Sequence, residues 1–113
     1  MGRIYKILGC AEWEAAHARG AFEGSAVDRQ DGYIHFSTGS QALETARRYF
    51  AGQADLVVLE VEADYLGAAL RWEPSRGGDL FPHLYSSLAL SRVLAVRLAP
   101  LDDAGVPDLG SLP

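Results

Sequence analysis

The sequence has little of what marks exported, membrane-spanning or nucleic-acid-binding proteins. It contains a single cysteine, Cys10, so an internal disulfide is excluded and a reducing, cytoplasmic setting fits best. No window approaches the roughly 18 consecutive apolar residues of a membrane span, and the first residues lack the layout of a signal peptide. The net charge of -5 argues against the basic surface that broad nucleic-acid binding requires. We therefore expect a cytoplasmic protein with no nucleic-acid or membrane partner.

The composition is that of a small globular protein. The chain has 113 residues, of which 49% are hydrophobic and 22% are charged, and this is enough to bury a core. No internal repeat or low-complexity tract is present. We expect one α+β domain over residues 1–98. Residues 99–113, with three prolines, two glycines and three aspartates, are expected to form an extended tail anchored by Leu109 or Leu112.

Hydrophobic periodicity predicts five strands and two helices. The strands are expected over 3–8, 33–37, 55–62, 69–73 and 92–98, and the helices over 11–19 and 40–51. Residues 21–31 show no period and are expected to form a loop. The segment 80–85 is aromatic, and Pro82 should keep it out of a central strand, so that it can be a strand only at a sheet edge. The order indicates an α+β fold, with two N-terminal helices packed on small, mostly antiparallel sheets.

The stretch from Asp31 to Ser40 carries most of the polar chemistry. Alternation in a strand directs Ile34 and Phe36 to one side and Tyr33, His35 and Ser37 to the other. The next residues, Thr38 to Gln41, have the spacing of a capping box and predict the start of a helix. Free N–H groups at a helix start bind phosphate or carboxylate. We therefore expect an anion site over Ser37–Ser40, next to the His35 imidazole.

Two segments should supply much of the core. In the helix over 40–51, one apolar face is formed by Ala42, Leu43, Ala46, Tyr49 and Phe50. The β-branched run over 55–62 predicts a buried strand with Val58 inside. Truncation of Leu43 or Val58 should therefore destabilise the fold.

His35 is the first candidate for chemistry, because an imidazole at a strand end, beside a helix start, can bind a ligand and titrate near neutral pH. A histidine held by a backbone carbonyl for packing is the alternative. His83 lies among aromatic residues and fits a structural histidine, and His17 fits a surface position. The histidines have no metal-site spacing, so we expect no metal ligands.

Glu73 is the candidate acid, at the end of a short strand and on the same side as Arg71. A simple exposed ion pair between them is the alternative reading. Because each lies opposite its apolar neighbours, we expect His35 and Glu73 to face one cleft. The helical spacing of Tyr49 predicts a place in the core. The alternative is that its ring lines a pocket and packs against a planar ring of a ligand.

Several motifs together resemble a known family. They are Ile4–Ile7, Trp13, the D-G-Y-I-H-F-S-T block at 31–38, Gln41, Thr45, Tyr49–Phe50, Trp72–Glu73 and the F-P-H-L-Y block at 81–85. They resemble the small, mainly bacterial domain-of-unknown-function family 952, to about Leu98. That family resembles, at a distance, the ADP-ribosyltransferase fold, whose members bind NAD in a cleft between two small sheets. A likeness of fold does not by itself establish function.

The resemblance implies roles for particular residues. His35 with Ser37 or Thr38 would hold ribose hydroxyls, Tyr49 would stack on nicotinamide, and Glu73 would bind the ribose 2′-OH as positive charge develops. Two features depart from the pattern: Tyr49 ends a helix where such transferases carry their aromatic on a later strand, and Arg71 stands two residues before Glu73 in place of an acid.

We therefore expect a pocket for a nucleotide-like anionic ligand, with NAD as the candidate cofactor and NAD-dependent ADP-ribosyl or phosphate transfer as the candidate chemistry. His35 and Glu73 are the predicted catalytic residues. The predicted ligand-binding residues are Ser37, Thr38, Gly39, Ser40, Tyr49, Arg71, His83 and Tyr85. A non-catalytic binding module is the alternative, and a metal-dependent hydrolase is a third reading.

Overall fold

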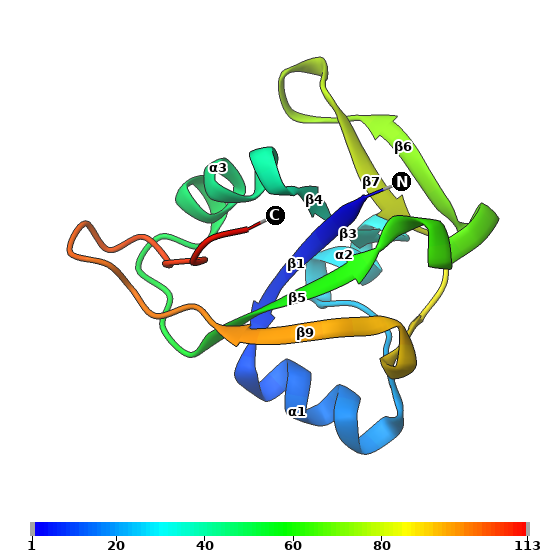
Figure 1. The fold of residues 1–113 in the computed structure, drawn as a ribbon, viewed down its shortest axis with the longest axis horizontal. Helices are drawn as coiled ribbons and strands as arrows, with labels where there is room; N and C mark the ends of the chain where they lie inside the picture. The colour runs from blue at the N-terminus through cyan, green and yellow to red at the C-terminus, as the bar shows by residue number, and fades with distance from the viewer. Residues whose placement is uncertain (1, 113) are drawn as a thin grey trace.

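The computed structural model describes residues 2–112, without the side chain of Arg76. The three α-helices of the described residues lie in the first half of the chain, among strands, and strands dominate the second half (Figure 1). In order, the elements are β1 (Arg3–Gly9), α1 (Cys10–Arg19), β2 (Ala21–Phe22), α2 (Ala26–Asp31), β3 (Ile34–His35), β4 (Ser37–Thr38), α3 (Gly39–Tyr49), β5 (Leu56–Glu62), β6 (Leu70–Pro74), β7 (Leu80–Leu84), β8 (Leu88–Ala89) and β9 (Val93–Leu98). Short 3-10 helices span Ala63–Ala69, Arg76–Gly78 and Leu90–Arg92.

The strands form antiparallel sheets, as predicted for an α+β fold. One sheet has four strands in the order β4-β1-β5-β9, and a second has three in the order β3-β7-β6. A short β2-β8 pair completes the set. The three-stranded sheet carries His35, Arg71, Glu73 and His83 of the predicted site, and the four-stranded sheet carries much of the core.

Two apolar clusters form the core. β1 contributes to both, because Ile4 and Leu8 point into one cluster while Tyr5 and Ile7 point into the other. Alternate residues of β1 thus face opposite clusters, as expected of a strand that is buried on both sides. The predicted helix over 11–19 is confirmed as α1, which buries Ala16 and ends at Gly20 in the left-handed conformation.

α3 begins as predicted but buries a narrower face. The Thr38 hydroxyl accepts from the Gln41 N–H, and the Gln41 side chain accepts from the Thr38 N–H, so the capping box is present. Leu43, however, is 52% exposed, and its predicted burial is wrong. The buried positions are Ala42 and Ala46, one helical turn apart, and small side chains let a helix lie close to the strands beneath it.

The predicted loop over residues 21–31 is wrong, because it contains β2 and α2. Ser25 and Asp28 form a second capping box, and Gly32 ends the helix in the left-handed conformation with its N–H bonded to the Asp28 carbonyl. A helix of six residues is too short to show a hydrophobic period, so its caps were the only local signal.

The single strand predicted over 33–37 is divided between two sheets. β3 pairs with β7, whereas β4 pairs with β1. Phe36 separates them, with its side chain in the core and its N–H bonded to the Pro82 carbonyl. His35 and Ser37 therefore belong to different sheets.

β7 is the middle strand of its sheet, so the edge position predicted from Pro82 is wrong. Pro82 lies opposite Trp72 of β6, and its carbonyl accepts from Phe36 on the other side. The nitrogen of a strand residue points to the same side as its carbonyl. The missing N–H therefore faces away from β6, beyond the end of the two-residue β3, and the ladder with β6 is intact.

The segment after β9 packs onto the second cluster. Ala99 and Leu109 are buried there, which confirms Leu109 as an anchor. Within this segment Leu101 pairs with Pro107. In the described part of the chain, no helix combines the length and apolar character that a membrane span requires.

Candidate functional site

One face of the three-stranded sheet gathers polar and aromatic side chains. His35 of β3 lies opposite His83 of β7, which in turn lies opposite Arg71 of β6. Side chains two residues apart on a strand point to the same face. This face therefore also carries Tyr33, Glu73 and Tyr85. We call this the polar face, and it comprises Tyr33, His35, Arg71, Glu73, His83 and Tyr85. His35 and Glu73 thus lie on the same face of this sheet, and that they face one cleft stays a prediction.

Glu73 is held by two hydrogen bonds to one of its oxygens. Its Oε1 lies 2.8 Å from His83 Nδ1 and accepts from the Tyr85 hydroxyl at 2.8 Å. These bonds, that from His83 foremost, lower the pKa of Glu73, and the Glu73 carboxylate raises the pKa of Tyr85. The described residues make no hydrogen bond to Oε2, and the Glu73 side chain is one third exposed. A partly exposed carboxylate is thus fixed through one oxygen, and its other oxygen has no hydrogen-bond partner among the described residues.

His35 lies between two carboxylates. Its Nδ1 is 2.6 Å from Asp28 Oδ1, and its Nε2 is 3.0 Å from Asp31 Oδ2. A neutral imidazole has one N–H and can donate to one of them, whereas an imidazolium donates to both. His35 is therefore already engaged within the protein.

Asp28 is the buried end of this chain of contacts, at 2% exposure. It contacts Lys6 Nζ at 2.8 Å and accepts from the backbone N–H groups of Ser25 and His35. Burial acts to raise the pKa of Asp28, but the bond from His35 and the charge of Lys6 outweigh it and hold that pKa well below its usual range. Burial lowers the pKa of Lys6, against the pull of Asp28.

Aromatic rings cover the histidines. The Tyr33 ring stacks on His83 with centroids 4.1 Å apart, and it lies 4.6 Å from His35 and 5.2 Å from Tyr85. The two histidine rings are 5.5 Å apart. The Arg71 guanidinium lies over the Tyr85 ring, with its Cζ 4.8 Å from the ring centroid. The polar face is therefore a continuous layer of rings bordered by carboxylates.

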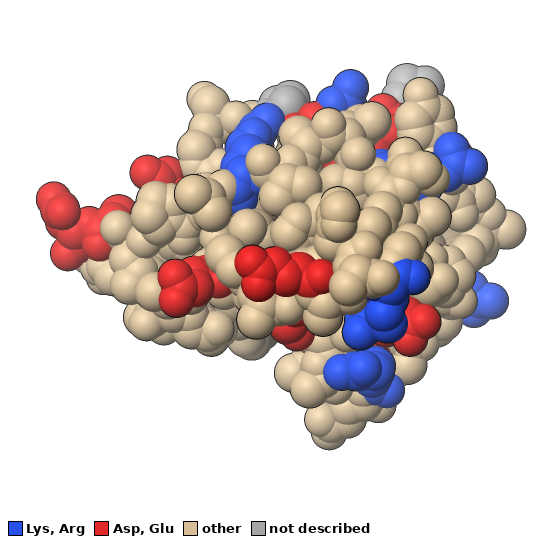
Figure 2. All heavy atoms as spheres, turned by 90° about the horizontal axis from the view of Figure 1, so that it is seen from below, with Lys and Arg blue, Asp and Glu red and all other residues tan. Residues whose placement is uncertain are grey.

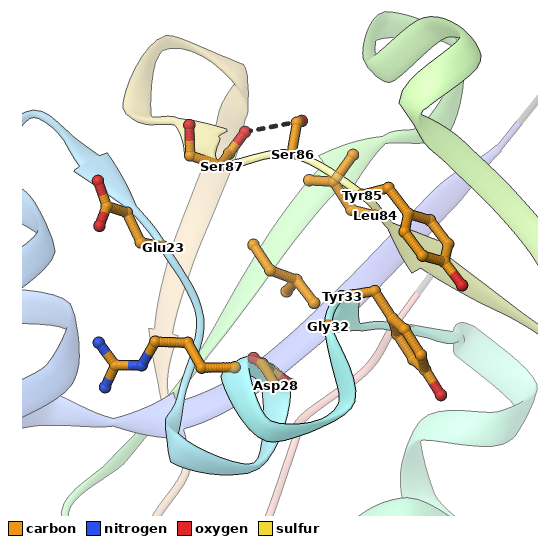
Figure 3. A pocket seen from close by; sticks show the side chains of 10 residues that line it. Glu23, Asp28, Gly32, Tyr33, Leu84, Tyr85, Ser86 and Ser87 are labelled. Atoms are coloured by element: carbon orange, nitrogen blue, oxygen red, sulfur yellow. Dashed lines mark hydrogen bonds between the residues drawn. The ribbon is translucent and has the colours of Figure 1, made fainter.

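A hollow of about 380 Å³ adjoins this layer. Tyr33 and Tyr85 belong to both, and Figure 3 shows their rings side by side at one end of the hollow, with Glu23 at the other. Its volume lies in the range of small-molecule sites. The lining residues are Glu23, Asp28, Arg29, Gly32, Tyr33, Ile34, Leu84, Tyr85, Ser86 and Ser87.

The structure does not bring all predicted ligand residues to the polar face. Ser37 is buried, and its hydroxyl contacts that of Thr45 at 3.0 Å. Tyr49 is exposed at the C-terminal end of α3, in a different part of the fold. Thr38, Gly39 and Ser40 stand at the start of α3, where Thr38 serves as the cap.

Beside that helix start lies a second hollow of about 760 Å³. It is lined by Ser40, Gln41, Glu44, Arg48, Gly77, Asp79 and Leu80. The lining mixes acids with Arg48, so its composition does not favour an anion, and the anion site expected at the helix start stays a prediction.

Sequence reasoning missed the buried pair that holds His35. Alternation places Lys6 with Ile4 and Leu8 on one side of its strand. Its partner Asp28, on a helix 22 positions away, was not foreseen. The one local signal was the Ser25-to-Asp28 capping spacing. Among the described residues, no group of three or more metal-ligating side chains could hold an ion.

Comparison with known proteins places the chain in a family. The sequence model of the family described as "Protein of unknown function (DUF952)" matches residues 7–96. The chain belongs to this DUF952 family. The match spans the polar face and stops before the segment that follows β9. No curated protein matches the chain.

Solved structures of one relative agree in fold. The crystal structure of protein CC0527 from Caulobacter crescentus is 59% identical, covers 93% of this chain and 92% of its own, and superposes with a TM-score of 0.91. The solution NMR structure of CC0527 is also 59% identical, with coverages of 97% and 95% and a TM-score of 0.88. The fold of that relative is therefore seen both in a crystal and in solution, and this chain is similar to both structures.

Proposed function

We propose that this protein binds a nucleotide with a cationic planar ring, of which NAD is the type, on the polar face of the three-stranded sheet. The observation that carries the proposal is the Glu73 carboxylate, fixed by His83 and Tyr85 through one oxygen and open at the other. A fixed, partly exposed carboxylate oxygen is an acceptor for the vicinal hydroxyls of a ribose.

The charge around the rings favours this class of ligand over a purely anionic one. Glu73 and Asp31 border the ring layer, while Asp28 is already neutralised by Lys6. Tyrosine rings with carboxylates at their margin attract a positively charged ring. Arg71, over the Tyr85 ring, is the candidate partner for a phosphate. His35 acts here as a positioning residue, because both of its nitrogens are engaged.

The same arrangement supports cleavage of the nicotinamide–ribose bond as a second, finer proposal. When that bond breaks, its electron pair leaves with nicotinamide and positive charge develops on the ribose. A carboxylate bonded to the 2′-hydroxyl stabilises that charge. Water or an acceptor hydroxyl then forms the new bond to the ribose carbon and loses a proton, which completes hydrolysis or ADP-ribosyl transfer. Transfer of a phosphate is an alternative use of the same ligand.

Binding is tested by calorimetry and thermal shift with NAD, nicotinamide mononucleotide and ADP-ribose. A ligand at 100 times its Kd adds about 2.7 kcal/mol to the free energy of unfolding. Glu73→Gln keeps the shape but removes the charge, and it should weaken NAD binding at least about tenfold, which is about 1.4 kcal/mol. Glu14→Gln, on the exposed side of α1, is the matched control and should bind as wild type does.

Absence of binding for both NAD and nicotinamide mononucleotide would contradict the proposal, and so would equal NAD affinity in the Glu73 variant. Release of nicotinamide from NAD, followed by chromatography, then separates the two readings. Release that is lost in Glu73→Gln supports catalysis. Binding without release supports a non-catalytic binding module.

A further inference from the structure

β9 is the outermost strand of the four-stranded sheet, and among the described residues no strand pairs with its outer side (Figure 1). Its exposed side chains are apolar: Leu94 is 45% exposed, Val96 43% and Leu98 74%. Soluble proteins usually protect such an edge with charged residues or proline. Within β9 the single charge is Arg97, which is bound to Glu60 at 2.9 Å and to the Ser111 carbonyl at 3.2 Å.

The backbone of β9 is arranged to accept another strand. The Ala99 N–H donates to the Leu56 carbonyl of the inner neighbour segment. Because successive residues of a strand direct their N–H and C=O groups to opposite sides, those of Val96 and Leu98 point outward. Their side chains are among the exposed apolar ones, so hydrogen bonding and apolar contact would be made together.

We propose that β9 pairs with β9 of a second copy of this chain, antiparallel and centred on Val96. In that register Val96 faces Val96 of the other copy, and Leu94 faces Leu98 in both directions. Residues directly opposite in an antiparallel pair share a face and are in contact. The strand is thus complementary to itself, and the two four-stranded sheets become one continuous sheet.

The charges beyond the two ends of β9 have the signs that this pairing requires. Arg92 precedes the strand, with its guanidinium over the Tyr65 ring at 5.7 Å and no ion pair among the described residues. Asp102 and Asp103 follow it, in the loop at the left of Figure 1, where Figure 2 shows acidic side chains. An antiparallel twofold pair places the basic end of each copy beside the acidic end of the other.

The expected dimer is weak. A six-residue strand covers less than the roughly 1,200 Å² of a stable interface, and a bulge between Glu60 and Val61 in the register with β9 adds twist at the Leu94 end. We therefore expect a weak dimer, with a Kd in the micromolar range or higher.

Sedimentation equilibrium and light scattering over about 1 μM to 1 mM test the proposal. The mass of wild type should rise from 12.2 kDa toward twice that value. Val96→Lys places two like charges on the twofold axis and should weaken association at least tenfold, with an unchanged melting curve. Leu43→Lys, at a similarly exposed site on α3, should associate as wild type does. A wild-type mass that stays at 12.2 kDa would overturn the proposal, as would equal association of the Val96 variant.

A charge exchange tests the register separately. Arg92→Glu alone should weaken self-association, and so should Asp103→Arg alone. Mixing the two variants should restore association, because both charged contacts of the mixed dimer then join opposite charges, whereas both are repulsive when either variant pairs with itself. A mixture no more associated than either variant would overturn the antiparallel register.

Discussion

Asp28 determines how the polar face is built, although its own side chain is buried. It receives Lys6 from β1 and His35 from β3, and its own helix is capped through the same carboxylate. A buried carboxylate is tolerated only when its charge and hydrogen-bonding capacity are met. Asp28 therefore joins two sheets and fixes the His35 ring. It is a buried structural residue that orients a side chain of the polar face.

Replacing Asp28 by asparagine should cost about 3 to 5 kcal/mol of unfolding free energy, because it leaves the Lys6 ammonium buried without a countercharge. Urea denaturation followed by circular dichroism measures this. Asp31→Asn, which alters the exposed partner of the same His35 ring, is the control and should cost at most about 1 kcal/mol. Equal small losses in both variants would show that the Lys6–Asp28 pair contributes little.

The pH dependence of stability follows from the lowered pKa of Asp28. A carboxyl group whose pKa is lower in the folded than in the unfolded state contributes stability that is fully present above its unfolded pKa, near 4. That contribution is lost as the pH falls below about 4 toward the folded pKa. The difference in unfolding free energy between wild type and Asp28→Asn, measured by urea denaturation, should therefore be large at pH 7 and smaller at pH 3. A constant difference would contradict this origin.

Among the elements, α3 and β5 differ in how well the apolar character of a residue predicts its burial. α3 packs through alanines, and Leu43 points away from the core. β5 is buried on both sides, with Val58 in the second cluster. The apolar character of a residue is thus a weak guide to its burial on α3 and a good one on β5.

Leu43→Ala should accordingly change the unfolding free energy by no more than about 0.5 kcal/mol, as exposed substitutions usually do. Val58→Ala should cost about 1 to 3 kcal/mol through lost contacts and a cavity. Chemical denaturation of the two variants side by side gives the comparison directly. A larger loss for Leu43 than for Val58 would mean that the buried face of α3 has been assigned incorrectly.

At the scale of the whole molecule, the segment after β9 is part of the folded domain. Leu109 is buried in the second cluster, beside residues of β1 and α3. Leu109→Ala should therefore cost about 2 to 5 kcal/mol, as core leucine truncations do. Leu101→Ala, at a 38% exposed position of the same segment, is the control and should cost much less. If both variants unfold at the wild-type midpoint, the segment contributes nothing to stability.

The amino-acid sequence by itself determined the local features. The start of α3 was predictable because Thr38 and Gln41 cap it through neighbouring residues, and α1 because Gly20 ends it. The buried strands over 3–8 and 55–62 were predictable from apolar runs, which bury in any context. The likeness of the 31–38 and 81–85 blocks to the DUF952 family was also readable.

Only the tertiary structure decided which polar residues meet. His35 and Ser37 are two residues apart but belong to different sheets, because the chain leaves one sheet at Phe36 and enters the other. His83 and Glu73 are ten apart and hydrogen-bonded, because β6 and β7 place them on one face. Lys6 and Asp28 meet across the core. Such pairs depend on strand register and sheet assignment, which are set by long-range packing and leave no periodic signal in the sequence.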